Sequence, residues 1–460
     1  MSEDPLSIAL SDPGKTRAPM AASPMPPVVV LGAGLTGLSA AYHLRRPTVL
    51  VERGPEVGGH ARSTRQCGFT FDVTGHWLHL REPQTRALVA GLFAPGELVS
   101  VERRTRVFTH GALLAYPFQA NLHGLPLEVV QECLVEFIAA RERAARGEQP
   151  ARSFEAFAEA RFGRGIARHF FVPYNTKLWG MHPNQLTAEW VSRYIPVPEV
   201  AQVIGGAIGV PQEGLGYNAS FLYPRDGGID ALPRRLAAGL PVGTELVLGS
   251  DVEAVDPARR RVKLSAEAQW RDYHALVSTI PLPELVRRIV DAPPAVRAAA
   301  DALRWVRWRW LDVATRVRVP VDYHWVYVPE TRYPFFRVGV YSNAALSMAP
   351  HGCSSLYVEL SEREGAVDVP AVLQALVEVG ALASVDDVLF TAERRAEHAY
   401  VVFDDAHGPA TRTILEWLES VGIRSCGRYG AWVYNAMEDC LIAGREAATW
   451  AEGQVRKVRS

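Results

Sequence analysis

The chain has 460 residues, 48% of them hydrophobic, and its 49 basic residues almost balance its 50 acidic ones. At roughly 100–200 residues per domain, this length predicts two to four domains. The net charge of −1 excludes a general polyanion binder, so we expect no nucleic-acid partner.

The beginning of the chain predicts a tail without fixed structure. Residues 1–27 combine proline, serine and charged residues without an apolar core, so we expect them to be disordered and not a secretory signal. No run of 18 apolar residues follows, which predicts no membrane span. The five cysteines are scattered and form no CxxC pair, which favours a reducing compartment and a cytoplasmic location.

The first predicted element opens a nucleotide-binding unit. Val28–Leu31 is an apolar run typical of a buried parallel strand, and it leads into Gly32, Gly34 and Gly37 at G-x-G-x-x-G spacing. A helix to about residue 45, a strand at 48–51 and the acid Glu52 follow. A carboxylate there can bind the adenosine ribose, which predicts a dinucleotide site. The alternative is a tight glycine turn in an ordinary α/β domain.

The next part of the chain has helical periodicity. Apolar residues recur at helical spacing over 126–146, and Gly147 stands where a helix-ending glycine is expected. Ser153 and Thr187 are expected to cap two further helices. Residues 120–205 are therefore predicted to form a helical insertion.

Strand patterns return after residue 240. The segments 246–248 and 261–264 are predicted to flank a polar turn, and 275–280 to form a buried strand. A sheet is expected within 304–360, with strands at 313–319 and 355–360, followed by helices at 370–380 and 439–450.

An unusual run of alternating arginine and tryptophan begins this sheet. It extends from Arg304 to Trp310 and could indicate single-stranded nucleic-acid stacking. The period of two from Arg307 onward favours a strand with tryptophan inward and arginine outward. The histidines, such as His76 and His79, lack partners at ligand spacing, which predicts no metal site.

Several motifs resemble a known family. Glu52 followed by Gly58-Gly59 and Arg62 resembles the second signature of the FAD-dependent amine-oxidase and mutase superfamily. Further segments resemble UDP-galactopyranose mutases in order and spacing; these are residues 68–76, 116–119, 173–180, 190–193, 217–221, 224–228, 325–327, 336–338 and 427–434, with Asp439 opening the closing helix.

The resemblance implies a fold, a cofactor and a reaction. The implied α/β fold has a discontinuous Rossmann-like FAD-binding domain (28–115, 215–300 and 425–455), a helical domain (120–205) and a β-sheet substrate domain (301–424). The implied activity is that of an isomerase interconverting pyranose and furanose forms of a nucleotide sugar such as UDP-galactose. It would proceed through a flavin N5-sugar adduct formed by reduced FAD, with an external reductant such as NAD(P)H. The resemblance leaves a homo-oligomer open.

The resemblance also implies roles for individual residues. His76, Arg193 and Arg337 are expected to be catalytic. Substrate binding is expected from Tyr116, Gln119, Tyr174, Asn175, Trp179, Arg193, Asn218, Trp325, Tyr327, Arg337, Tyr400 and Tyr434. Cofactor binding is expected from Gly32, Gly34, Leu35, Thr36, Gly37, Glu52, Arg53, Gly59, His60, Arg62, Gly75, His76, Val252, Arg428, Glu438, Asp439 and Cys440.

Chemistry supports these assignments, and alternatives remain. Arginine suits a diphosphate, tyrosine can donate to the same oxygens, and asparagine can serve sugar hydroxyls. Core packing is the alternative for any single aromatic residue. Ala344, Gly214 and Glu438 depart from the mutase pattern, which leaves another nucleotide sugar open. The alternative enzymes are an amine oxidase, a protoporphyrinogen-oxidase-like enzyme or a desaturase. A further alternative is a protein that binds flavin as a scaffold and catalyses no reaction.

Overall fold

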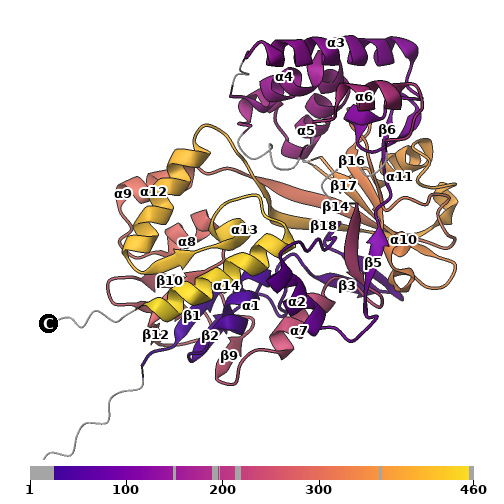
Figure 1. The fold of residues 1–460 in the computed structure, drawn as a ribbon. Helices are drawn as coiled ribbons and strands as arrows, with labels where there is room; N and C mark the ends of the chain where they lie inside the picture. The colour runs from indigo at the N-terminus through magenta and orange to yellow at the C-terminus, as the bar shows by residue number, and fades with distance from the viewer. Residues whose placement is uncertain are drawn as a thin grey trace, which may run out of the picture.

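The computed structural model describes residues 25–148, 152–188, 195, 197–212, 219–361 and 365–454. All but the last three positions of the predicted tail, residues 1–27, lie outside these ranges. Figure 1 shows a parallel sheet with its helices, a larger sheet beside it, and a group of helices above the larger sheet. In the described ranges, no helix is both long enough and apolar enough to cross a membrane.

The parallel sheet joins segments that are far apart in the sequence. Its order is β19 (Ile423–Ser425), β13 (Ala275–Ser278), β1 (Val28–Leu31), β2 (Thr48–Val51) and β9 (Thr244–Val247), with every neighbouring pair parallel. The strands β1, β2 and β13 are buried along their whole length. Burial on both faces explains why these strands are continuous apolar runs. The helices α1 (Leu35–His43) and α14 (Met437–Gly453) pack against each other beside the sheet (Figure 1).

The two segments predicted to flank a polar turn lie in different sheets. The segment predicted at 246–248 overlaps β9 of the parallel sheet, whereas 261–264 is β11 (Arg261–Leu264) of a separate three-stranded sheet. There β11 pairs with β10 (Val252–Asp256) and β12 (Trp270–Asp272). The strand β10 was missed because polar and apolar residues do not alternate regularly along it.

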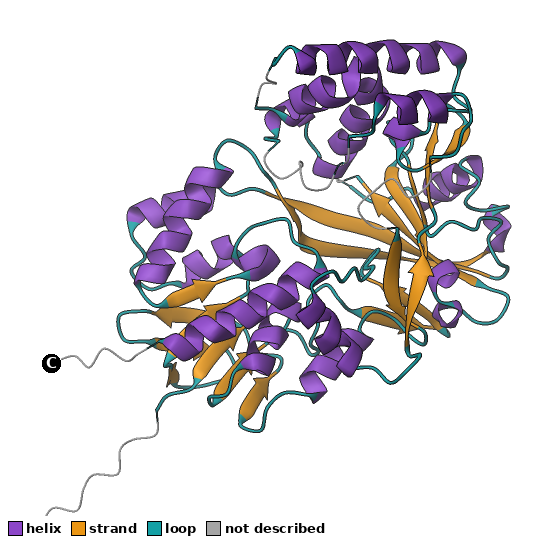
Figure 2. Cartoon of the chain, in the orientation of Figure 1, coloured by secondary structure: helices purple, strands orange, loops and turns teal. Residues whose placement is uncertain are grey.

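The larger sheet has seven strands, five of which come from residues 305–401. Figure 2 shows its strands beneath the upper group of helices. Its order is β18 (Val388–Val401), β14 (Trp305–Thr315), β17 (Ser354–Leu360), β16 (Phe335–Val340), β15 (Trp325–Tyr327), β6 (Thr105–Thr109) and β7 (Ala112–Ala115). One face is apolar: Leu311, Val338 and Val358 pack in a core with Leu376 of α11 (Val369–Glu378). Because side chains alternate between faces, the neighbouring residues on these strands point to the opposite face.

The predicted helical insertion contains four α-helices in the described residues: α3 (Leu127–Ala145), α4 (Phe154–Ile166), α5 (Val172–Trp179) and α6 (Val200–Ala207). Gly147 follows α3 with φ of 82°, as predicted for a helix-ending glycine. The Ser153 hydroxyl accepts the Ala156 N–H at 3.2 Å and caps α4. Thr187 instead forms a β-bridge with Ser153, and residues 189–194, where its helix was expected, lie outside the described residues.

Two segments differ from the predicted domain limits. The range 28–115 includes β6 and β7, which join the larger sheet rather than the parallel one. The range 301–424 includes α12 (His407–Ser420), which packs against α9 (Pro294–Ala302) and β19 beside the parallel sheet. Both differences arise because contacts between distant segments, and not local periodicity, decide which core a segment joins.

The remaining elements are short and connect these units. They are the pairs β3 (Ser63–Gln66) with β4 (Phe69–Asp72) and β5 (Leu98–Glu102) with β8 (Ser220–Pro224), and the helices α2 (Pro83–Gly91), α7 (Ala231–Ala238), α8 (Leu282–Arg288), α10 (Tyr341–Ala344) and α13 (Gly427–Gly430).

Candidate functional site

A cavity of about 720 Å³ extends from the β1–α1 turn to the polar face of the larger sheet. Its lining comes from both sheets, from the loop that carries His76 and from the segment 434–440 that opens α14. Four buried polar atoms of lining residues have no hydrogen-bond partner in the described part of the chain: His76 Nδ1, His398 Nε2, Trp308 Nε1 and Trp325 Nε1. Buried polar groups are rarely left unpaired, so these atoms indicate a site for a ligand or water.

The β1–α1 turn has the geometry that a pyrophosphate needs. Gly32 has φ of 93°, and a Cβ on Gly37 would lie 1.8 Å from the Gly32 carbonyl oxygen, so both positions require glycine. A Cβ on Gly59 would lie 3.2 Å from the Gly34 Cα, so the two glycine loops meet backbone to backbone. No side chain of the described residues caps the N-terminus of α1, which leaves its first N–H groups able to bind phosphate oxygens.

Glu52 fixes the loop beside this turn. Its carboxylate accepts the N–H of Ala33 at 2.9 Å and the N–H of Gly54 at 2.8 Å. Each oxygen keeps a further lone pair, so the carboxylate can also accept ribose hydroxyls. The turn, the uncapped helix and this acid together fit the phosphate and ribose groups of a dinucleotide.

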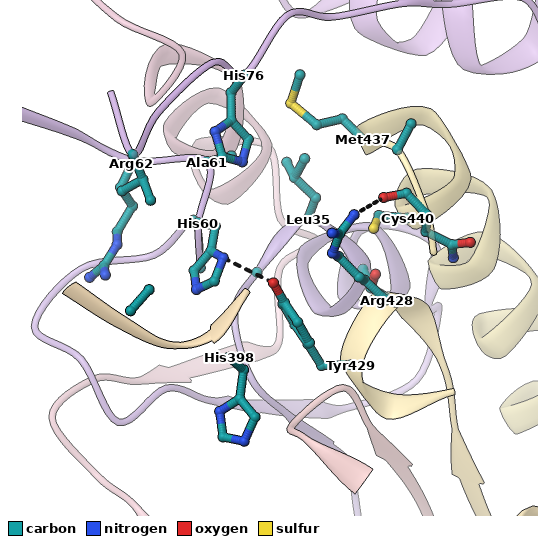
Figure 3. Close-up of a pocket in the computed structure, with 18 of the residues that line it drawn as sticks. Leu35, His60, Ala61, Arg62, His76, His398, Arg428, Tyr429, Met437 and Cys440 are labelled. Carbon is teal, nitrogen blue, oxygen red and sulfur yellow. Dashed lines mark hydrogen bonds between the residues drawn. The ribbon is translucent and has the colours of Figure 1, made fainter. Parts of the chain in front are cut away.

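Two histidines of the cavity are held neutral. Burial lowers the pKa of His76 to about 4 and the pKa of His60 to about 3, so neither ring is charged at neutral pH. His60 Nδ1 lies 3.1 Å from the Tyr429 hydroxyl, which in turn donates to the Ala399 carbonyl oxygen at 3.1 Å. Figure 3 shows the His60 ring directed at the Tyr429 hydroxyl, with His398 below them in the view.

The polar face of the larger sheet forms the other end of the cavity. The strand register aligns Trp310, Glu359, Arg337 and Tyr327 in one row across β14, β17, β16 and β15. Trp310, Arg337 and Tyr327 line the cavity. Arg337 pairs with the fully buried Glu359 through Nε to Oε2 and through Nη2 to Oε1, the latter at 2.7 Å. Its Nη1 has no partner among the described residues, so it can donate to a ligand.

Arg428 is a second buried cation, and its partners are neutral. Its Nη1 donates to the Asn435 carbonyl oxygen at 2.6 Å, the bond drawn at Arg428 in Figure 3. Its Nη2 donates to the Ala399 carbonyl oxygen at 3.1 Å. Its guanidinium lies 5.0 Å from the Tyr434 ring centroid and 5.2 Å from that of Tyr400. No carboxylate of the described residues forms a salt bridge with it. Since buried charges are normally paired, an anion in the cavity would balance Arg428.

Most residues predicted from the sequence line this one cavity. They are Gly32, Gly34, Leu35, Thr36, Glu52, Arg53, Gly59, His60, Arg62, Gly75, His76, Val252, Arg428, Glu438, Asp439 and Cys440 from the cofactor set, and Tyr116, Trp325, Tyr327, Arg337, Tyr400 and Tyr434 from the substrate set. Gly37 lies beneath the turn. Glu438, which departs from the mutase pattern, accepts the backbone N–H groups of Arg81 and Glu82.

Four described residues of the predicted substrate set do not line the cavity. Asn175 makes bonds within the helical region, donating to Phe171 O at 2.8 Å and accepting Trp179 Nε1–H at 3.2 Å. Trp179 and Tyr174 pack behind the lining residues Tyr400 and Tyr327, with ring centroids 5.5 and 5.2 Å apart. Gln119 is buried outside the lining as well. The predicted residues Arg193 and Asn218 lie outside the described residues.

The cavity also contains residues that the sequence did not point to as ligands. Trp308 and Trp310 point inward, as the strand pattern predicted, and line the cavity. Arg309 is only 9% exposed and pairs with Glu393 at 3.0 Å, so the outward position predicted for it is wrong. His398 and Tyr429 also line the cavity. Pairing of β18 with its neighbour brings His398 there, and the short helix α13 brings Tyr429. No local pattern signals these contacts.

The described residues contain no cluster of three or more His, Cys, Asp and Glu side chains that could hold a metal ion. The cavity offers two buried guanidinium groups, several phenols and two neutral imidazoles around a dinucleotide turn.

Comparison with known proteins identifies the family. The sequence matches the family described as flavin containing amine oxidoreductase over residues 35–308, which is more than half of the chain. The chain therefore belongs to the flavin-containing amine oxidoreductases.

A mutase has a closely similar structure. The crystal structure of reduced UDP-galactopyranose mutase has a TM-score of 0.86 and 26% identity, covering 94% of this chain and 97% of that one. A putative protoporphyrinogen oxidase from Exiguobacterium sp. 255-15 shares the fold, with a TM-score of 0.71 and 18% identity over 94% of this chain and 100% of that one. The predicted fold class and the resemblance to UDP-galactopyranose mutases are confirmed.

A curated relative matches over a shorter region. Human protoporphyrinogen oxidase is 27% identical over 307 residues, which cover 59% of this chain and 63% of that protein. The match thus spans less than two thirds of the human enzyme.

Proposed function

We propose that this protein is a flavin-dependent mutase that interconverts the pyranose and furanose forms of a nucleotide sugar, with UDP-galactose as the first candidate. FAD is the proposed cofactor, because the turn at Gly32 and the acid Glu52 fit a dinucleotide. Reduced FAD would supply the nucleophile for the anomeric carbon, and an external donor such as NAD(P)H would keep it reduced.

The observation that carries the proposal is the pair of buried guanidinium groups at the sheet end of the cavity. Arg428, which the sequence predicted as a cofactor-binding residue, has no carboxylate partner in the described residues, and we assign it here to the diphosphate. Arg337 retains a free Nη1 beside its buried salt bridge. Burial raises the pKa of Tyr400, and the positive charges of Arg337 and Arg428 both oppose that rise, so both act near this phenol. An anion between them would be a diphosphate, whose geometry arginine suits.

The protein's contribution to the reaction follows from these groups. When the bond between the anomeric carbon and the diphosphate breaks, negative charge accumulates on the phosphate oxygens. Arg337, Arg428 and the Tyr400 hydroxyl would stabilise that charge and keep the leaving group in place for its return. His76, neutral through burial, would pack against the flavin and orient it without adding charge.

The test is a ring-isomer assay on reduced protein. The purified protein is reduced with dithionite and given UDP-galactofuranose or other nucleotide sugars, and ring isomers are separated by chromatography. We expect isomerisation by the reduced protein and a UDP-induced change in the flavin absorbance spectrum. Failure of both with every nucleotide sugar would contradict the proposal.

A second candidate is a protoporphyrinogen-oxidase-like enzyme, which the match to the human oxidase favours. Such an enzyme removes hydride equivalents from its substrate and passes them to oxygen. Peroxide formation on addition of protoporphyrinogen, without any response to UDP, would favour this candidate over the mutase. The two buried guanidinium groups favour the mutase, because they provide a site for a doubly charged leaving group.

A further inference from the structure

One strand of the cavity carries three tryptophans, and one of them has an unused donor. On β14, Trp305 Nε1 donates to Glu397 at 3.4 Å, and Trp310 Nε1 donates to Asp312 at 3.1 Å. Trp308 Nε1 is buried and has no hydrogen-bond partner among the described residues. The Trp308 side chain is only 8% exposed and lines the cavity. The strand therefore satisfies two of its three indole donors with protein and leaves the third unpaired at the wall of the cavity.

The position of Trp308 adjoins the proposed diphosphate site. Its ring centroid lies 5.3 Å from that of Tyr400, whose ring in turn lies 5.2 Å from the Arg428 guanidinium carbon. Tyr400 also stacks on Tyr434, with centroids 6.2 Å apart and planes 9° apart. Tyr400 therefore lies between Trp308 and Arg428, and Trp308 is next to the place proposed for the phosphates.

The chemistry of this side chain limits what it can bind. An indole N–H donates and cannot accept, so its partner must be an oxygen or another acceptor on the ligand. An indole ring also offers a flat apolar face with a polar tip. An uncharged surface of this kind does not compensate phosphate charge. It suits a sugar ring, which has an apolar C–H face and hydroxyl oxygens at its edge.

We propose that Trp308 is a specificity-determining residue for the sugar: its ring packs on the sugar face, and its Nε1–H donates to one sugar hydroxyl oxygen. This inference rests on the proposed function. A site that hydrogen-bonds a particular hydroxyl rejects analogues that lack it, because the buried donor is then left unpaired. Trp308 thereby selects among nucleotide sugars that share the same diphosphate.

The test compares Trp308→Phe with a matched control on the same strand. Trp305→Phe removes an indole donor that bonds Glu397 and does not line the cavity. For Trp308→Phe we expect kcat/KM for UDP-galactofuranose to fall about 10-fold, as expected for one lost hydrogen bond, with the Kd of UDP unchanged within about twofold. The control should change neither quantity.

A panel of monodeoxy UDP-galactoses then locates the hydroxyl. In the wild-type protein each analogue has a penalty in kcat/KM relative to the parent sugar. Trp308→Phe should reduce the penalty for one analogue and leave the others unchanged. An unchanged set of penalties, or an equal loss of UDP and sugar binding, would overturn the assignment.

These results separate the inference from the function on which it rests. If wild-type protein binds UDP and isomerises the sugar while Trp308→Phe behaves identically, only the role of Trp308 is wrong. If wild-type protein neither binds UDP nor isomerises any nucleotide sugar, the proposed function fails, and the inference fails with it. FAD absorbance measured on each variant confirms that the comparison uses folded, loaded protein.

Discussion

At the residue scale, the two buried arginines of the cavity differ in the groups that surround them. Arg337 is neutralised by Glu359, a residue that is 0% exposed and reaches it from the neighbouring strand. Arg428 is surrounded by carbonyl oxygens and tyrosine rings instead. The uncompensated charge therefore belongs to Arg428, and we expect it to contribute most to diphosphate affinity.

Replacing Arg428 by glutamine should therefore weaken UDP binding strongly. The expected increase in Kd is at least 10-fold, because a charge-assisted hydrogen bond contributes about 1.5–3 kcal/mol. Titration of the flavin absorbance with UDP measures the effect, with bound FAD recorded separately. Arg332→Gln is the control, since Arg332 is exposed and lies outside the cavity lining. Equal UDP affinity in wild type and Arg428→Gln would contradict this role.

A second residue-scale prediction concerns pH. The pKa of buried His76 falls from 6.5 to about 4, so between these values the unfolded chain binds a proton that the folded chain does not. The free energy of unfolding should therefore decrease as the pH falls from about 6.5 to about 4. His76→Gln should remove part of that decrease. Urea unfolding at pH 7.5 and pH 5 measures the difference, and identical pH dependence in both proteins would show that His76 is not the group responsible.

At the scale of elements, the β1–α1 turn depends on direct contact between glycines. Gly37→Ala would place a methyl group 1.8 Å from the Gly32 carbonyl oxygen, so α1 must move away from β1. We expect loss of bound FAD and a lower melting temperature. Gly91→Ala is the control, because a Cβ on that helical glycine meets nothing within 4 Å. Retention of FAD by Gly37→Ala would show that the turn does not hold the cofactor.

A buried lysine joins the helical region to the larger sheet. Lys177 of α5 donates from Nζ to the carbonyl oxygens of Val328 and Glu330 at 2.8 and 2.9 Å, and also to that of Phe335. Val328 and Glu330 lie on the connection between β15 and β16, and Phe335 is the first residue of β16. These two strands carry Tyr327 and Arg337. The helical region thus helps to hold the proposed diphosphate site in place.

Lys177→Met keeps the aliphatic stem and removes these three hydrogen bonds. Three buried carbonyl groups would lose a charged donor, so we expect a loss of several kcal/mol in the free energy of unfolding. We also expect weaker UDP binding, because Tyr327 and Arg337 would be less firmly positioned. Urea unfolding and UDP titration of the same preparation test both effects, and an unchanged value in each would refute the link.

At the scale of the whole molecule, the sequence predicted the local elements and missed the side-chain contacts that depend on strand register. The strand, turn and helix around Gly32–Gly37 follow from consecutive residues, and the structure has them where expected. The pairing of Arg337 with Glu359 does not follow from either residue's neighbours, because it needs β16 and β17 to align. Trp308 and His398 reach the cavity in the same way. Asn175 was predicted to bind substrate because its motif matched, whereas in the structure it bonds within its own helical segment.

The fold itself allows more than one chemistry. The chain shares its architecture with a mutase and with a putative protoporphyrinogen oxidase, so the arrangement of sheets and helices does not choose between isomerisation and net oxidation. We propose that the groups at the sheet end of the cavity make that choice. The decisive property is whether the flavin's electrons are consumed in each turnover.

The most direct measurement therefore compares the amount of product formed with the number of electrons that the flavin loses. Protein reduced once with a single equivalent of dithionite, in the absence of oxygen, is incubated with excess UDP-galactofuranose. The account predicts many molecules of UDP-galactopyranose per flavin, with the flavin still reduced at the end. A flavin that becomes oxidised in proportion to product, or no product at all, would contradict it.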